Sequence, residues 1–240
     1  MVRYLFENPF INHECVQSGL EKAPIPTNIC ETYAQCNEDL MVESLLRALM
    51  RRSGRDMRSV RYAEIGANHP VQTSATYLLY RLYGASGILV EANPGLIANL
   101  QKQRPNDIVV NCAITAQDAG LVEIFVHEKN ELTSMSLDHI ANFQALGGTD
   151  QVVEKIAVES MGINRFLAKY FGDRLDFMSV DVEGYDLEVI QAMDPVFQPS
   201  IIQCEHELKV DAFDAVFNAK GYRLAMLTDV NAIYVRSGII

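Results

Sequence analysis

The sequence predicts an α/β fold, a mostly parallel sheet with helices on both faces. Apolar strand-like segments alternate with helical segments along most of the 240 residues, the pattern of successive βαβ units. The last two predicted strands, near 222–227 and 231–236, are joined by a turn too short for a crossover. They should therefore form an antiparallel hairpin at the end of the parallel sheet.

Composition limits the classes of function. The chain is 49% hydrophobic and 21% charged, as in soluble globular proteins, and its formal net charge is −11. An acidic surface does not attract nucleic-acid phosphates or anionic lipid, so neither partner is expected. The five cysteines show no CxxC spacing, which argues against a disulfide framework or a zinc site. Since neither a signal peptide nor a membrane span is recognisable, a cytoplasmic location is expected.

Two parts are predicted along the chain, residues 1–58 and 59–240. Residues 1–32 show no periodicity and form an irregular arm, of a kind that covers a site or packs across a homodimer. Residues 37–51 form an amphipathic helix, with Asn37 as N-cap and Gly54 beyond its end.

The second part contains the strand–helix repeat. Strands are predicted at 60–65, 86–91, 107–111, 175–181 and 200–205, and helices near 73–83, 94–103, 162–171, 185–193 and 210–219. Thr73 or Ser74 should cap the helix near 73–83, which Gly84 ends, and Asn93 should cap the next one, ahead of Pro94. An insertion at about 115–160 departs from the repeat with two strand-like segments, 121–128 and 152–159, joined by a polar loop.

The turn after the first of these strands reads Glu64-Ile65-Gly66-Ala67-Asn68-His69-Pro70. Gly66 lets the backbone approach a ligand closely. The turn lacks the G-x-G-x-x-G pattern, and Pro70 removes an amide donor, which disfavours a pyrophosphate. The acid two residues before the glycine, Glu64, suits a cationic ligand such as the methionine part of S-adenosylmethionine (SAM).

An acid, Glu91, also ends the next predicted strand, 25 residues after Gly66. A carboxylate at this place accepts hydrogen bonds from both hydroxyls of a ribose, although it could instead cap the following helix. The turn and the strand ends supply the remaining predicted cofactor-binding residues: Ala67, Asn68, Ala92, Asn111 and Ala113. Of these, Asn111 and Ala113 should face an adenine ring.

A second group of polar residues follows two later strands. Asp181 and Glu183 lie in the turn Asp-Val-Glu-Gly-Tyr-Asp, and Glu205 and His206 end the next strand. The carboxyl ends of parallel strands meet at one edge of the sheet, where ligands bind near the topological switch point. We therefore expect these residues close to Glu64, around the reacting group.

Two chemical interpretations of this second group stay open. His206 is a candidate general base that takes the proton of a hydroxyl nucleophile, with Asp181 and Glu205 beside it. Alternatively, Asp181, Glu205 and His206 hold a divalent cation such as Mg²⁺, which orients and acidifies the hydroxyl.

At these residues the chain resembles the FkbM family of SAM-dependent methyltransferases. The matching segments are YAQCNEDLMVESLL at 33–46, YAEIGANHP at 62–70, GILVEANPGLIANLQKQRP at 87–105, DFMSVDVEGYDLEVI at 176–190 and IIQCEHE at 201–207. The resemblance implies a Rossmann-like class I methyltransferase fold, with a mostly parallel seven-stranded sheet, a terminal antiparallel hairpin, inserted strands and an N-terminal helical arm. It also implies SAM as methyl donor and a hydroxyl of a sugar or natural product as acceptor.

By position, the resemblance assigns Glu64, Gly66, Asn68 and Glu91 to SAM binding, and it places Asp181 and Glu183 by the methionine end. Two other classes of function compete. One is an NAD(P)-dependent oxidoreductase on the same topology, disfavoured by the missing glycines and the absence of a Tyr-x-x-x-Lys pair near the fourth strand. The other is a protein that binds SAM or a nucleotide without turnover.

Overall fold

The structure, a computed structural model, describes residues 3–4, 31–127, 133–135, 152–172 and 174–239. In this part of the chain, seven strands form one sheet in the order β11-β12-β10-β9-β3-β4-β5. Their bounds are Arg61–Ile65 (β3), Ser86–Glu91 (β4), Ile108–Asn111 (β5), Phe177–Val180 (β9), Ile201–Glu205 (β10), Tyr222–Leu227 (β11) and Asn231–Arg236 (β12). The predicted strands of the repeat are therefore confirmed.

The pairing within this sheet matches the predicted topology. β12 runs antiparallel to its neighbours β10 and β11, and every other pair of neighbours is parallel. The chain builds β3, β4 and β5 outward in one direction and then returns to place β9 on the other side of β3. The switch point of this Rossmann-like sheet thus lies between β3 and β9.

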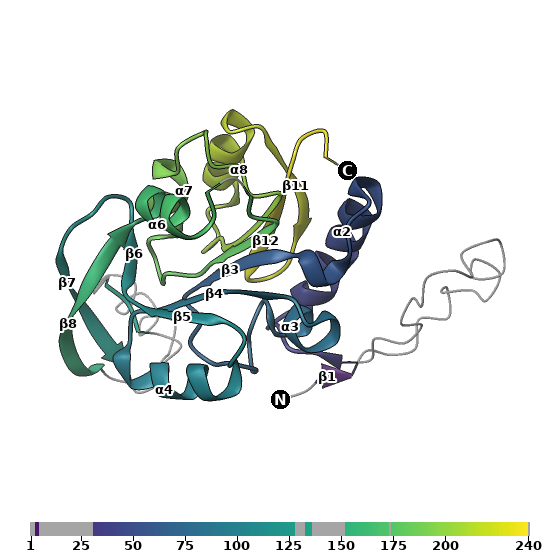
Figure 1. The fold of residues 1–240 in the computed structure, drawn as a ribbon. Helices are drawn as coiled ribbons and strands as arrows, with labels where there is room; N and C mark the ends of the chain where they lie inside the picture. The colour runs from purple at the N-terminus through teal and green to yellow at the C-terminus, as the bar shows by residue number, and fades with distance from the viewer. Residues whose placement is uncertain (1–2, 5–30, 128–132, 136–151, 173, 240) are drawn as a thin grey trace.

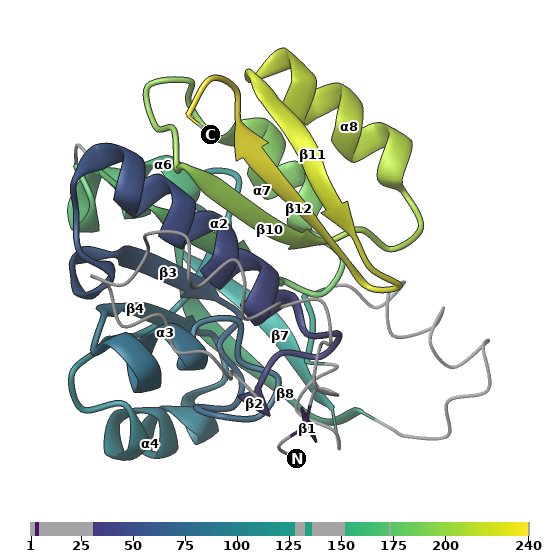
Figure 2. The same ribbon diagram turned by 90° about the vertical axis from the view of Figure 1, so that its right-hand side faces the viewer.

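Helices cover both faces of the sheet (Figures 1 and 2). α2 (Glu38–Ser53), α3 (Tyr77–Tyr83) and α4 (Pro94–Gln103) contribute to one hydrophobic cluster, and α6 (Ile163–Tyr170), α7 (Asp186–Ala192) and α8 (Val210–Ala219) to the other. Strand residues alternate between the clusters, with Tyr62 in the first and Ala63 in the second. Cys112 and Cys204 are buried residues of the second cluster.

The insertion forms a second, three-stranded sheet beside β4 and β5 (Figure 1). Its strands are β6 (Ala113–Thr115), β7 (Leu121–His127) and β8 (Val152–Gly162). β8 lies in the middle, antiparallel to β7 and parallel to β6. The prediction of inserted strands is confirmed. Most of the predicted loop between them lies outside the described residues.

The N-terminal prediction is tested only in part. Two short strands, β1 (Arg3–Tyr4) and β2 (Glu31–Thr32), pair with each other, and the rest of the predicted arm lies outside the described residues. Helix α2 ends at Gly54 in the left-handed conformation, as predicted, with φ of 67°. Asn37 stands at the N-cap position of α2, as predicted, but it adopts φ of 67° and its side chain makes no capping hydrogen bond.

The caps of the next two helices follow their sequence signals more closely. Asn93 caps α4 by accepting a hydrogen bond from the backbone N–H of Gly95 at 2.9 Å. Helix α3 begins at Tyr77, later than predicted, but the Ser74 hydroxyl still accepts from the Tyr77 N–H at 3.1 Å. Gly84 ends α3 as predicted. Among the described residues, no helix is long and apolar enough to cross a membrane.

Candidate active site

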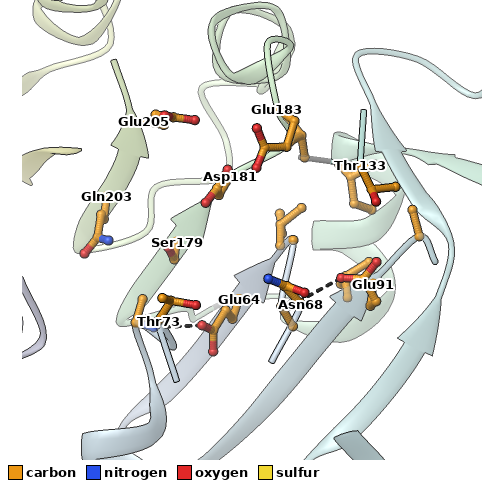
Figure 3. Close-up of a pocket in the computed structure, with 18 of the residues that line it drawn as sticks. Glu64, Asn68, Thr73, Glu91, Thr133, Ser179, Asp181, Glu183, Gln203 and Glu205 are labelled. Carbon is orange, nitrogen blue, oxygen red and sulfur yellow. Dashed lines mark hydrogen bonds between the residues drawn. The ribbon is translucent and has the colours of Figure 1, made fainter. Parts of the chain in front are cut away.

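A pocket of about 700 Å³ opens at the carboxyl ends of β3, β4, β9 and β10 (Figure 3). Most of the predicted site residues line it: Glu64, Gly66, Ala67, Asn68, Glu91, Ala92, Ala113, Asp181, Glu183 and Glu205. Asn111 and His206 are not among the lining residues. The pocket straddles the switch point, which is where an open α/β sheet binds its ligand. Its volume is in the range of cofactor sites.

Position 66 requires a glycine, because the turn after β3 approaches the backbone at the end of β9 closely. It adopts φ of 82°, and a Cβ atom at this position would lie 1.8 Å from the backbone oxygen of Asp181. The N–H groups of Gly66 and Ala67 donate to the Val90 oxygen at 3.0 and 2.9 Å, which fixes the turn against β4. The turn therefore lies directly between the two halves of the sheet.

Glu64 lines the pocket and also stabilises the turn after β3. Its carboxylate is almost fully buried and accepts hydrogen bonds from three groups of the segment before α3: the Ser74 hydroxyl at 2.9 Å, the Ala75 N–H at 2.7 Å and the Thr76 hydroxyl. Burial raises the pKa of Glu64, and Arg104 opposes that rise. The predicted ammonium contact thus competes with protein donors that already occupy both oxygens.

Arg104 is the cation that balances this buried carboxylate, and sequence reasoning missed it. It is 0% exposed. Its guanidinium donates to the Pro70 oxygen at 3.0 Å and to the Thr76 hydroxyl at 2.9 Å, and it pairs with Asp107 at 2.7 Å. Arg104 directly follows helix α4, and a basic residue at the C-terminal end of a helix is usually exposed to solvent. The sequence therefore gives no sign that this residue is buried.

Glu91 ends β4 and faces the pocket. Its carboxylate accepts from the backbone N–H groups of Asn68 and Asn93, at 2.8 and 2.7 Å, and the first of these bonds is drawn in Figure 3. Burial, with the nearby Glu183, raises the pKa of Glu91. Asn111 acts behind this residue, since its amide donates to the backbone oxygens of Glu91 and Ala92. Asn111 thus positions the end of β4 and is not among the residues that line the pocket.

Three carboxylates converge on the other side of the switch point. Asp181, Glu183 and Glu205 each offer an oxygen within 4.8 Å of the others, and Figure 3 shows the side chains facing one another. Asp181 Oδ1 is buried without a hydrogen-bond partner. Burial, followed by Glu183 and Glu205, raises the pKa of Asp181 well above its usual range. Such a group is poised to take up a proton or to face a cation.

The structure is at odds with both predicted roles of His206. Its Nδ1 atom accepts from the Leu208 N–H, and its Nε2 atom lies 3.1 Å from the Thr228 oxygen, to which it must donate. The ring is buried, and both nitrogens are occupied by backbone groups. His206 therefore ties the β10–α8 turn to the β11–β12 turn. In the cluster of three carboxylates, Glu183 stands where His206 was predicted.

Polar side chains that sequence reasoning missed line the pocket between β9 and β12. Ser179 and Gln203 are paired in register, and Asn231 pairs with Glu205. Asn231 donates to the buried Glu38 at the start of α2, at 2.9 Å. A signal was present in the sequence, since Ser179 and Gln203 interrupt apolar strands two residues before the predicted acids.

Left-handed backbone is concentrated at the pocket. Among the described residues, six non-glycine residues have positive φ, and five of them line it: Asn68, Thr73, Glu183, Glu207 and Leu208. Conformations of this kind cost about 1–3 kcal/mol each and persist where the surroundings enforce them, often at functional sites.

The opposite end of the pocket is apolar. It is lined by Ala92, by side chains of β6 and β7 and by one residue of the insertion: Ala113, Ile114, Ile124 and Met135. The insertion also contacts the cluster of acids, because the Ser134 hydroxyl donates to the Glu183 backbone oxygen at 2.6 Å. The pocket thus has an apolar end, a carboxylate near its middle at Glu91, and an acidic end.

Comparison with known proteins identifies the family. A model of the methyltransferase FkbM domain matches residues 64–224. The chain belongs to the FkbM methyltransferase family. The match covers both sides of the switch point, from Glu64 through the acids of β9 and β10. Membership of this family supports the assignment of the protein to the SAM-dependent methyltransferases. No match was found among curated proteins.

Solved structures with similar folds are also methyltransferases, at low identity. A precorrin-6y C5,15-methyltransferase from Geobacter metallireducens is 14% identical, with 80% of this chain and 88% of that chain covered and a TM-score of 0.42. The MTase domain of delta-N METTL16 is 10% identical, with coverage of 82% and 81% and a TM-score of 0.42. A candidate sarcosine dimethylglycine methyltransferase from Galdieria sulphuraria is 11% identical, with a TM-score of 0.40, and this chain covers 62% of it. Such low scores say nothing about substrate.

The residues of this FkbM-family pocket fit SAM. Glu91 lies where a ribose is bound in such folds, and the apolar end beside Ala92 and Ala113 suits an adenine ring. The neighbouring cluster of Asp181, Glu183 and Glu205 suits the positive charge of a sulfonium, which donates no hydrogen bond to these acids. SAM bound here would supply an electrophilic methyl group on a sulfonium.

The role of Glu91 is tested by Glu91→Gln. We expect the affinity for S-adenosylhomocysteine (SAH) to fall by about 1–3 kcal/mol, because an amide would replace the carboxylate that is predicted to accept from the ribose hydroxyls. Titration calorimetry measures the change. The control is Glu188→Gln, an exposed carboxylate on α7, which should leave the affinity unchanged. Equal affinities of the two variants would exclude Glu91 from the ribose site.

Proposed function

We propose that this protein transfers a methyl group from SAM to a hydroxyl of a small acceptor, such as a sugar or natural product. The observation that carries the proposal is the pocket's division at the switch point. Residues that suit SAM come from β3, β4 and the segment after β5, and the acids that suit proton removal come from β9 and β10. A reacting hydroxyl between them would meet the methyl donor on one side and carboxylates on the other.

Oxygen methylation requires a proton acceptor. The acceptor oxygen forms its bond to the methyl carbon as the carbon–sulfur bond breaks, and the hydroxyl proton must leave. Asp181 is the candidate general base, because its Oδ1 atom has no hydrogen-bond partner and its pKa is raised well above the usual range. Glu205, on the neighbouring strand, lies beside it. His206 is not proposed for this role because protein groups occupy both ring nitrogens.

Ligand binding and methyl transfer test the proposal together. Titration with SAM, SAH, NAD and NADP should show binding of the first two only. A labelled methyl group should then appear on an oxygen of at least one member of a library of hydroxylated compounds. Binding of NAD without SAM would support the oxidoreductase, and SAM binding without transfer to any acceptor would support a binding protein.

A divalent cation is a second candidate for activating the hydroxyl. The observation that favours it is the group of three carboxylates, Asp181, Glu183 and Glu205, with oxygens within 4.8 Å of one another. Hard cations such as Mg²⁺ prefer such oxygen ligands. This set replaces the predicted one, because Glu183 takes the place of His206.

Removal of metal ions decides between base and cation. If the carboxylates hold a cation, EDTA should abolish methyl transfer, and added Mg²⁺ should restore it, while the affinity for SAH stays within about two-fold. If Asp181 acts as a base alone, EDTA should leave the rate unchanged. The control is a sample treated with EDTA already saturated with Mg²⁺.

A further inference from the structure

We infer that Gln203 and Asp181 together select acceptors that carry two neighbouring hydrogen-bond donors, one to be held and one to be methylated. This inference rests on the proposed methyl transfer and adds a specificity-determining residue to it. It depends on two buried oxygen atoms in the pocket, on adjacent strands, that have no protein donor: Asp181 Oδ1 and Gln203 Oε1.

Gln203 is the more unusual of the two. The residue is 5% exposed, and its Oε1 atom has no hydrogen-bond partner. On β10 it lies two residues after the fully buried Ile201, and across the sheet it pairs with the fully buried Ile233. An uncharged polar group in such surroundings destabilises the protein unless a partner satisfies it. Since no described protein group does so, the donor must come from a molecule that enters the pocket, which is water in the free protein and a ligand that displaces it.

The position of Gln203 indicates which ligand this is. The residues that suit SAM lie on β3, on β4 and after β5, whereas Gln203 lies on β10, two strands beyond β3 in the other direction. Asp181, at the end of β9, separates the two regions, and Figure 3 shows Gln203 on the far side of Asp181 from Glu91. The missing donor therefore belongs to the acceptor.

Two unpartnered oxygens demand two donors. Asp181 and Gln203 belong to adjacent strands and differ by two residues in register, so their Cα atoms are roughly 8 Å apart. A molecule with hydroxyls on neighbouring carbons can donate to both. An acceptor with one hydroxyl satisfies one oxygen and leaves the other buried without a partner. The pocket should thus discriminate by hydroxyl number as well as by shape.

The test uses the full chain saturated with SAH, which fills the SAM region without turnover. Calorimetry with SAH comes first, and its failure would contradict the proposed function itself. Ligand-observed NMR then compares the vicinal cyclohexanediol with cyclohexanol. We expect the wild-type protein to bind the diol about 10-fold more tightly, because the mono-alcohol leaves a buried acceptor unpaired.

The matched variants are Gln203→Met, which keeps the side-chain length without the amide, and Gln101→Met, the same change on an exposed part of α4. Gln203→Met should bind SAH normally, lose the preference for the diol, and unfold about 2 °C or more above the wild type without ligand. Gln101→Met should match the wild type. The inference is overturned if the wild type shows no preference, or if Gln203→Met retains it. The wild-type comparison decides even if that variant fails to fold.

Discussion

The Asp181→Asn variant is expected to be more stable than the wild-type protein in the absence of ligand, and to transfer methyl groups at least about 100-fold more slowly. Both effects have one cause. Burial and the neighbouring Glu183 and Glu205 oppose ionisation of Asp181, so the wild-type fold is destabilised when this carboxyl is charged. An amide has no charge to bury, but it cannot take up a proton. Stability and function therefore change in opposite directions, as at many active sites.

The pH dependence follows from the direction of the pKa shift. The pKa of Asp181 is raised in the folded protein, so its favourable contribution is fully present below the ordinary carboxyl range and is lost as the pH rises through the raised value. The melting temperature of the ligand-free wild type should fall as the pH rises above the ordinary carboxyl range, and that of Asp181→Asn should fall less. A slope remains, because burial also raises the pKa of Asp186.

Thermal unfolding across this pH range, with and without SAM, checks the prediction. At pH 8 the variant should melt about 2–4 °C above the wild type, as expected for roughly 1 kcal/mol in a chain of this size. SAM should stabilise the wild type more than the variant. The control is Glu154→Gln, an exposed carboxylate of β8, which should change neither slope nor rate. A variant that loses stability and keeps its activity would remove Asp181 from the mechanism.

Arg104→Met should have the largest effect on stability, a loss of about 3–5 kcal/mol. The guanidinium is completely buried, and its removal leaves the carboxylates of Glu64 and Asp107 without their cation. The segment between β3 and α3 loses two anchors at the same time, at the Pro70 oxygen and the Thr76 hydroxyl. We therefore expect weaker SAH binding as well, although Arg104 does not line the pocket.

Denaturant unfolding and SAH calorimetry measure the two effects. Arg104→Lys keeps the positive charge but lacks the planar guanidinium group with its several donors. This variant should show an intermediate loss of stability. Arg52→Met, at an exposed position near the end of α2, should remain close to the wild type. If Arg104→Met unfolds at the same denaturant concentration as Arg52→Met, the buried cation does not hold the site together.

The elements of the fold were predictable because their signals are local. Short apolar strands, and helices flanked by residues such as Asn93 or Gly84, can be recognised within a few residues of sequence. The acids at strand tips were predictable for a related reason. Parallel strands bring their carboxyl ends to one edge, so Glu91 and Asp181 had to lie near the same pocket.

The errors concern residues whose role depends on distant partners. His206 follows a strand beside an acid, as a general base often does. Its ring, however, is hydrogen-bonded to the Thr228 backbone oxygen in the β11–β12 turn. Arg104 follows a helix like any solvated base, but its partners lie up to 42 residues away, at Tyr62. Asn37 precedes a helix without capping it. Such roles are set by tertiary neighbours, which local sequence patterns do not report.

The switch between β3 and β9 has an evolutionary consequence. On the proposed assignment, the groups that recognise the methyl donor belong to an earlier stretch of chain, from Glu64 to Ala113, and those that recognise the acceptor to a later one, from Ser179 to Asn231. Each set lies on its own strands and on the turns that follow them. Substitutions in the later stretch can therefore diversify the molecules that are modified while the donor site is inherited intact.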